Sequence, residues 1–256
     1  MLIYNKIYRN KKLIFFKTHI KNMELNYKIL FEANRVYGEK YKRYNVSWKK
    51  PQKTQWNNLY ESSDLLVKKQ VLKFLNEFGC RIPVTKVVIQ GIKKAHLASI
   101  PYIDALRNES LCDLNFDLDV VIYDKAFTLG QTIYAVFDFF SNIGHRFSHV
   151  AASKLLHQVN PHVFMMWDNG ITKHYGVRKN SEDYVYKFLP LMKEKLNQVV
   201  HTYMNDFNVN RIEAITKLNN YRDNKTLLKL LDEYNWLLTR SMMPKEDSLQ
   251  SIINSY

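Results

Sequence analysis

The sequence predicts a mainly α-helical protein, and two observations support this fold class. Apolar residues recur at spacings of three and four along most of the 256-residue chain, which is the periodicity of amphipathic helices. The chain has only 7 glycines and 6 prolines, too few for the many turns of a β-sandwich. An apolar fraction of 46% excludes disorder as its main state.

The same periodicity, read with the usual start and stop signals, places the individual helices. A long helix should end near Gly79, Pro161 should end another, and Gly176 should follow a short one as its left-handed C-terminal residue. Residues 118–123 fit either a strand or a buried helix. We expect helices over 56–78, 84–97, 100–106, 131–140, 148–158, 169–175, 183–207, 211–218 and 226–239.

Basic residues are concentrated at the N-terminal end. The chain carries 38 Lys and Arg against 24 Asp and Glu, and the first sixty residues hold 14 of the basic residues and only 3 of the acidic ones. A basic lobe on a nearly balanced body is typical of a protein that binds a polyanion such as DNA. The alternative is a general lysine bias on solvated helix faces.

One stretch of this lobe, "GEKYKRYNVSWKKPQKTQW" (38–56), mixes cations with aromatic rings. Cations suit phosphates and flat rings suit exposed bases, so we expect Lys42, Arg43, Lys49 and Lys50 to contact DNA. An irregular connection whose aromatic residues pack into the core is the other interpretation.

The remaining composition limits the class of protein. Cys80 and Cys112 form no CxxC pair, which excludes a zinc finger, and we expect neither a metal nor a cofactor. No apolar run approaches the ~18–20 residues of a membrane span, so we expect a cytoplasmic protein, with a monomer favoured. Met23 is a candidate native start, which leaves open whether residues 1–22 belong to the native protein.

The segment "NIGHRFSHVAASKLLHQVNPHVFMMWDNGITKHYG" (142–176) carries the most specific pattern. A glycine turn leads into a helix of small residues, and an apolar run then precedes an aspartate, Asp168, at a helix start. This resembles the core of the helix-hairpin-helix DNA glycosylase superfamily, most closely its 8-oxoguanine-glycosylase-like branch. The resemblance covers about thirty-five residues.

The resemblance implies roles for several of these residues. Asp168 matches the essential aspartate of the family, and His149, nineteen positions earlier, stands where lysine-bearing members have their nucleophile. Lys154 is a further candidate, although it lies about 140° around a helix from residue 149. The turn, with Gly144, His145 and Arg146, is expected on the DNA backbone, but it keeps one glycine where the family has two.

Three aromatic residues of this region, Trp167, Phe147 and Tyr175, are candidates to stack on an extruded base, with core packing as the alternative. The family's fold has two helical subdomains with a central cleft. We therefore expect residues 65–160, ending in the degenerate hairpin, to form one subdomain, and residues 1–64 with 161–256 to form the other.

These observations predict a monofunctional DNA glycosylase that excises a modified base, in repair or in defence against modified phage DNA. The first alternative is a non-catalytic DNA-binding protein of the same fold. The second is a metal-dependent nuclease that uses the acids of "DLDVVIYDK" (117–125). As a simple N-cap, Asp168 would need no catalytic role at all.

Overall fold

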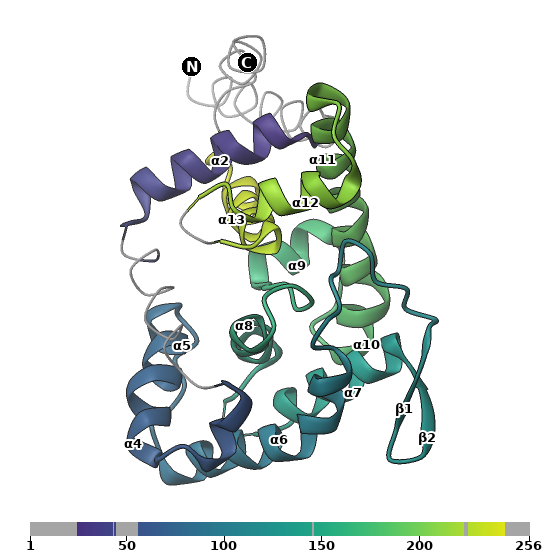
Figure 1. Cartoon of the computed structure of the whole chain (residues 1–256). Helices are drawn as coiled ribbons and strands as arrows, with labels where there is room; N and C mark the ends of the chain where they lie inside the picture. The colour runs from purple at the N-terminus through teal and green to yellow at the C-terminus, as the bar shows by residue number, and fades with distance from the viewer. Residues whose placement is uncertain (1–24, 43, 45–55, 145, 223–224, 244–256) are drawn as a thin grey trace, which may run out of the picture.

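The computed structural model of the chain describes residues 25–42, 44, 56–144, 146–222 and 225–243 (Figure 1). The described chain is mainly helical, which confirms the predicted fold class, and its only strands are a two-stranded hairpin. A single continuous cluster of buried apolar side chains runs through these elements.

The first described helix, α2 (Tyr27–Lys40), was not expected from the sequence. Asn26 caps it, since its side chain accepts a hydrogen bond from the backbone N–H of Ile29. The helix packs against α13 and α11 near the other end of the chain. Glu32 and Asn34 are buried along with its apolar residues.

The long helix expected over 56–78 is divided into shorter pieces. Ser63 interrupts it, because the Ser63 hydroxyl accepts from the N–H of Leu66 and starts a new helix. Gly79, with φ of 80°, ends the run as expected. The pieces are the 3-10 helix η2 (Trp56–Glu61), α4 (Asp64–Leu66), the π-helix η3 (Val67–Leu72) and α5 (Lys73–Glu77).

In the middle of the chain, two helices that were expected separately form one helix, and the segment 118–123, which fitted a strand or a helix, contains a strand. Helix α6 (Lys86–Ala105) continues through Pro101, where two separate helices had been expected. Strands β1 (Asp119–Ile122) and β2 (Lys125–Thr128) form an antiparallel hairpin with Val120 opposite Phe127. Helices α7 (Leu129–Ser141) and α8 (His149–Val159) follow and pack against each other.

The C-terminal half follows the expected pattern closely. Asp168, Asn210 and Thr226 are N-caps, and Gly176 ends a helix with φ of 67°. The elements are α9 (Asn169–Tyr175), α10 (Ser181–Asp183), the π-helix η4 (Tyr184–Phe188), α11 (Leu189–Phe207), α12 (Arg211–Asn219) and α13 (Leu227–Thr239).

Helix α8 lies in the middle of the molecule, as Figure 1 shows, with α4 to α6 on one side and α9 and α13 on the other. On one side α6 packs on α7, and on the other α2 packs on α13. Helix η2, residues 56–61, packs on α6. The division into two subdomains around a cleft stays a prediction.

Candidate functional site

A pocket of about 800 Å³ lies beside the N-terminal ends of α8 and α9. Its volume is in the range of sites for small organic ligands. Asp168, His149 and Lys154, the three candidate catalytic residues, all border it. The other lining residues are Tyr37, Tyr44, Phe78, Gly79, Cys80, Ser148, Val150, Met166, Asn169, Gly170, Ile171, Lys179, Asp232, Trp236 and Arg240.

The Asp168 carboxylate is fixed by hydrogen bonds to both of its oxygens. Oδ1 accepts from the N–H groups of Gly170 and Ile171, at 2.8 and 2.9 Å, and so caps α9. Oδ2 accepts from Nη2 of Arg240 at 2.6 Å. Burial acts to raise the pKa of Asp168, but the hydrogen bonds from Arg240 and Ile171 outweigh it and hold the pKa below its ordinary value. The group is therefore a carboxylate at neutral pH.

Arg240 is one of the residues of this site that the sequence did not reveal. Its guanidinium carbon lies 3.9 Å from the ring centroid of Trp236, and the guanidinium also donates to the Trp236 carbonyl. Arg240 follows the end of α13 directly and is 72 residues from Asp168. No local pattern predicts a contact across that separation.

Gly170 allows the close approach of α9 to the end of α13. A Cβ atom at this position would lie 3.2 Å from both Asp168 Oδ1 and Thr239 Oγ1, which is tighter than an ordinary contact. The glycine in "WDNG" therefore has a structural reason: any side chain here would press on the carboxylate that caps the helix.

Lys154, and not His149, acts electrostatically on Asp168. The positive charge of Lys154 contributes to lowering the pKa of Asp168, and its ammonium group donates to the Phe78 carbonyl at 2.8 Å. Burial lowers the pKa of His149, while Asp138 acts to raise it and Lys179 to lower it, so the ring is neutral at pH 7. Both side chains border the pocket despite their angular separation on α8.

The charges that border the pocket are mostly positive. Lys154, Lys179 and Arg240 face two carboxylates, Asp168 and Asp232. The first residues of α8, from its N-cap Ser148 onward, also border the pocket, and the free N–H groups of a helix N-terminus add partial positive charge. The site therefore suits a ligand with an anionic part, such as a phosphate.

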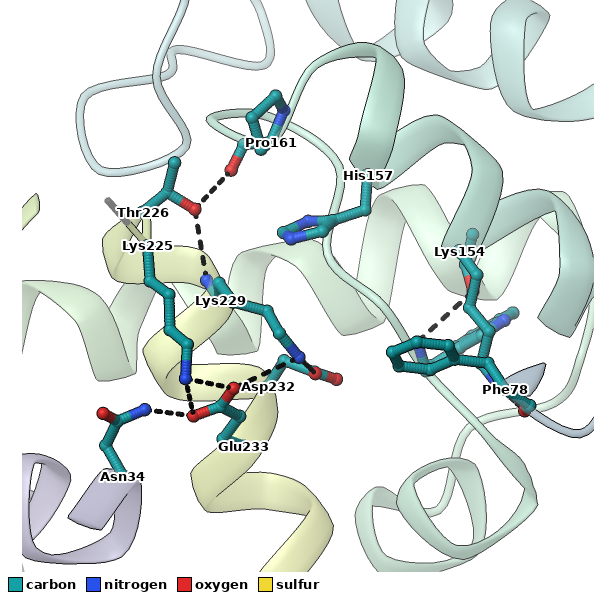
Figure 2. A network of polar contacts seen from close by, with 12 residues as sticks. Asn34, Phe78, Lys154, His157, Pro161, Lys225, Thr226, Lys229, Asp232 and Glu233 are labelled. Carbon is teal, nitrogen blue, oxygen red and sulfur yellow. Dashed lines mark hydrogen bonds and ion pairs between the residues drawn. The ribbon is translucent and has the colours of Figure 1, made fainter. Parts of the chain in front are cut away.

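A second wall of the pocket contains Asp232 of α13, which belongs to a cluster of buried charges shown in Figure 2. The ammonium group of Lys229 lies 2.7 Å from Oδ2 of Asp232, and that of Lys225 lies 2.9 Å from Oε1 of Glu233. Asn34 of α2 donates to Glu233 and so ties the two helices together. Burial by itself lowers the pKa of Lys229, but Asp232 and Glu233 outweigh it and hold the pKa above its ordinary value.

The three aromatic residues expected in a base pocket do not border this one. Trp167 is fully buried in the core, where its Nε1 donates to the His149 carbonyl. Phe147 is also buried, and the Tyr175 hydroxyl donates to Asn235 Oδ1. The closeness of these residues to Asp168 in the sequence did not show whether their rings face the pocket or the core. The rings that border the pocket are those of Tyr37, Tyr44, Phe78 and Trp236.

The expected DNA-contacting residues are only partly described. Lys42 is exposed at the end of the α2 segment, whereas Arg43, Lys49, Lys50 and His145 lie outside the described residues. The turn between α7 and α8 exposes Gly144 and Arg146. Gly144 has φ of 79°, so this position favours glycine, and its carbonyl accepts from the N–H of Phe147.

The acids on which the nuclease alternative depends belong to an exposed hairpin. Asp117, Asp119 and Asp124 are all exposed around β1 and β2. Within the described part of the chain, no group of three or more His, Cys, Asp or Glu side chains is placed to hold a metal ion. In the same residues, no helix has the length and apolar character needed to span a membrane.

Comparisons of the chain with protein-family models, with curated proteins and with solved structures find no match. The inference of function therefore depends on the geometry of the pocket and on the chemistry of its residues.

Proposed function

We propose that the protein is a monofunctional DNA glycosylase, which extrudes a modified base and hydrolyses its N-glycosidic bond to leave an abasic site. The observation that carries the proposal is Asp168. It is an ionised carboxylate, fixed at a helix N-terminus, and it borders a pocket in which cations predominate. A DNA substrate supplies both partners for such a site, namely phosphates for the cations and a sugar for the carboxylate.

The chemistry requires such a carboxylate. Cleavage of a glycosidic bond builds positive charge on the sugar, and a fixed negative charge beside it stabilises that transition state. The two N–H groups that hold Oδ1 prevent the carboxylate from turning away, and they leave Oδ2 to face the sugar or to orient the attacking water. Arg240, which now holds Oδ2, is positioned to exchange this contact for a DNA phosphate.

Lys154 acts through its charge in this proposal, and not as a nucleophile. Its ammonium group is engaged with the Phe78 carbonyl and also lies near the Phe78 ring. A monofunctional enzyme forms no Schiff base, so borohydride added during the reaction should trap no covalent complex with DNA. Trapping that Lys154→Met abolishes would instead show a lyase-coupled mechanism. The neutral His149 ring is proposed as a contact for water or for a phosphate.

The basic lobe supplies affinity that is independent of sequence. Changing Lys42, Arg43, Lys49 and Lys50 together to Ala should weaken binding to all DNA sequences about equally and reduce its salt dependence, because fewer counterions are released. Exposed basic residues away from the pocket, changed together as Lys94→Ala, Arg107→Ala, Lys125→Ala and Lys217→Ala, form the matched control. An unchanged salt dependence in the first variant would show that the lobe faces away from DNA.

A second candidate function has its own observation. The ion pair between Asp168 and Arg240 is also what a purely structural cap would show, and it favours the non-catalytic DNA-binding protein. In that case the protein would bind DNA through the same basic surface, and no base would be released.

Incubation of DNA with the protein, with and without later alkali, separates these functions. Strand breaks that appear only after alkali indicate a glycosylase, direct breaks that require Mg²⁺ indicate a nuclease, and binding without breaks indicates a non-catalytic protein. Genomic and phage DNAs with different modified bases form the substrate panel. Mass spectrometry of the released base then identifies the substrate and distinguishes a role in repair from one in defence.

A further inference from the structure

Asp232 is a buried carboxylate that borders the pocket and takes no part in the chemistry proposed for Asp168. The residue is only 7% exposed, and one of its oxygens, Oδ2, is held by Lys229. Among the described residues, its Oδ1 has no hydrogen-bond partner. Because Asp232 Oδ1 is not one of the fully buried atoms that lack a partner, it stays accessible, and a donor on the ligand can reach it.

The position of Asp232 on α13 places it in a row with two other pocket residues. Asp232, Trp236 and Arg240 follow one another at intervals of four, so they lie along one face of the helix and its end. Along this row the chain presents a hydrogen-bond acceptor, then a flat ring, then a guanidinium group. These suit the edge of a base, the face of a base and an anionic group respectively.

The Lys229 ammonium that holds the Asp232 carboxylate also lies near two aromatic rings. The Lys229 ammonium lies 5.5 Å from the Tyr37 ring centroid and 5.9 Å from that of Phe78, and both rings border the pocket. Figure 2 shows Lys229 and Asp232 on the side of α13 that faces Phe78 and Lys154. The Lys229 contact prevents Asp232 from rotating freely, which makes it a fixed acceptor at the wall of the pocket.

We infer that Asp232 determines which base the pocket accepts, because its Oδ1 accepts a hydrogen bond from the exocyclic amine of the extruded base. This inference rests on the proposed function. An ionised carboxylate is an acceptor only, so it pairs with the amine of a cytosine-, adenine- or guanine-type base and loses this hydrogen bond where hydrogen replaces the amine. Asp168 does not serve this purpose in the proposed function, because Gly170 and Ile171 hold its Oδ1 and its Oδ2 is assigned to the sugar or the attacking water.

The test uses pairs of nucleosides that differ at this group alone: deoxyadenosine with deoxynebularine, which has hydrogen in place of the 6-amine, and deoxyguanosine with deoxyinosine, which has hydrogen in place of the 2-amine. Isothermal titration of the full chain should show about tenfold tighter binding of the amine-bearing member of each pair, the usual effect of one hydrogen bond to a charged group. Asp232→Asn should abolish or weaken this preference, because the amide carries no charge and can present its NH₂ group to the pocket.

Two further variants keep the result decisive. Asp183→Asn is the matched control, because Asp183 is a buried carboxylate paired with Arg178 and Lys187 and does not border the pocket. It should keep the tenfold preference. If Asp232→Asn does not fold, the double variant Lys229→Met with Asp232→Leu removes the ion pair as a unit and should also lose the preference.

The inference is overturned if the wild type binds both members of each pair equally, if it binds neither at the solubility limit, or if the folded Asp232 variant keeps the preference. Base release plays no part in this measurement. A chain that prefers the amine but releases no base contradicts the glycosylase proposal and leaves the role of Asp232 standing. A chain that releases bases without this preference contradicts only the role of Asp232.

Discussion

Two walls of one pocket each present a carboxylate held by a cation, and they differ in how deeply that cation is buried. On the α8–α9 wall, Asp168 is held by backbone N–H groups and by Arg240, and the side chains of this pair remain 18% and 32% exposed. On the α13 wall, Asp232 is held by Lys229, whose side chain is only 1% exposed.

The difference indicates different tasks. A partly exposed ion pair contributes little to stability and can be exchanged for another partner, such as a phosphate. A buried ion pair cannot lose one member without leaving the other uncompensated, so it keeps its geometry when a ligand enters. The first wall is therefore suited to a reacting group, and the second to a fixed recognition group.

The largest expected effect concerns the α13 wall. Lys229→Met should lower the free energy of unfolding by about 3–5 kcal/mol, because Asp232 and Glu233 lose a buried counter-charge. Adding Asp232→Leu should restore much of the loss. Arg107→Met, at an exposed pair with Asp104, should change stability little. Urea denaturation measures all three, and equal effects at the buried and exposed pairs would remove the distinction between the walls.

An intermediate effect is expected from His157, which is fully buried on α8 and whose Nδ1 lies 2.5 Å from the Phe164 carbonyl oxygen. Burial lowers the pKa of His157 to about 3, with Lys229 acting in the same direction. Above its unfolded pKa of about 6.5 the residue is neutral in both states. As the pH falls from there towards 3, only the unfolded chain takes up the proton, and stability falls by ~1.4 kcal/mol per pH unit.

Unfolding measured between pH 6.5 and 5 tests this, since most carboxylates do not titrate in that range. His157→Gln should reduce the slope of stability against pH by ~1.4 kcal/mol per unit. His201→Gln, at an exposed histidine, is the control. If both variants keep the slope of the wild type, the neutral form of His157 does not contribute to folding.

The smallest effect on stability is expected at Arg240. Arg240→Ala should cost less than ~1 kcal/mol, because the pair with Asp168 is partly exposed. The same change should raise the pKa of Asp168, since it removes the hydrogen bond that most lowers it. The acid limb of the pH profile of base release should therefore move to higher pH, and Arg240→Lys should move it less. An acid limb that stays in place would show that Asp168 is not the group that titrates.

Local signals in the sequence were sufficient for most of the fold. N-caps at Ser148, Asp168 and Thr226, together with the left-handed Gly176, mark helix ends within a few residues, and each acts through neighbours in the chain. The same reasoning missed α2, in which two polar residues are buried: Asn34 donates to Glu233 on α13, and Glu32 pairs with Arg35 on the same helix.

The candidate site was predictable only where it is local. Asp168 and Lys154 lie within the resembling segment, and the structure places both at the pocket. Arg240 and Asp232 come from the far end of the chain, and no periodic pattern in the sequence predicts the contact of Arg240 with Asp168. Trp167 packs in the core, which the sequence had left open beside base stacking, because proximity in sequence does not show whether a ring faces the pocket or the core.

The central claim is that the charge of Asp168, and not its capping, is what the protein uses. Single-turnover base release by the wild type and by Asp168→Asn, recorded beside their melting temperatures, tests this most directly. Asn caps a helix about as well as Asp, so the melting temperatures should be nearly equal and DNA binding should survive. Base release should fall by about 10²–10⁴, because the transition state loses its counter-charge. Undiminished base release by an equally stable Asn variant would contradict the claim and leave Asp168 as a cap.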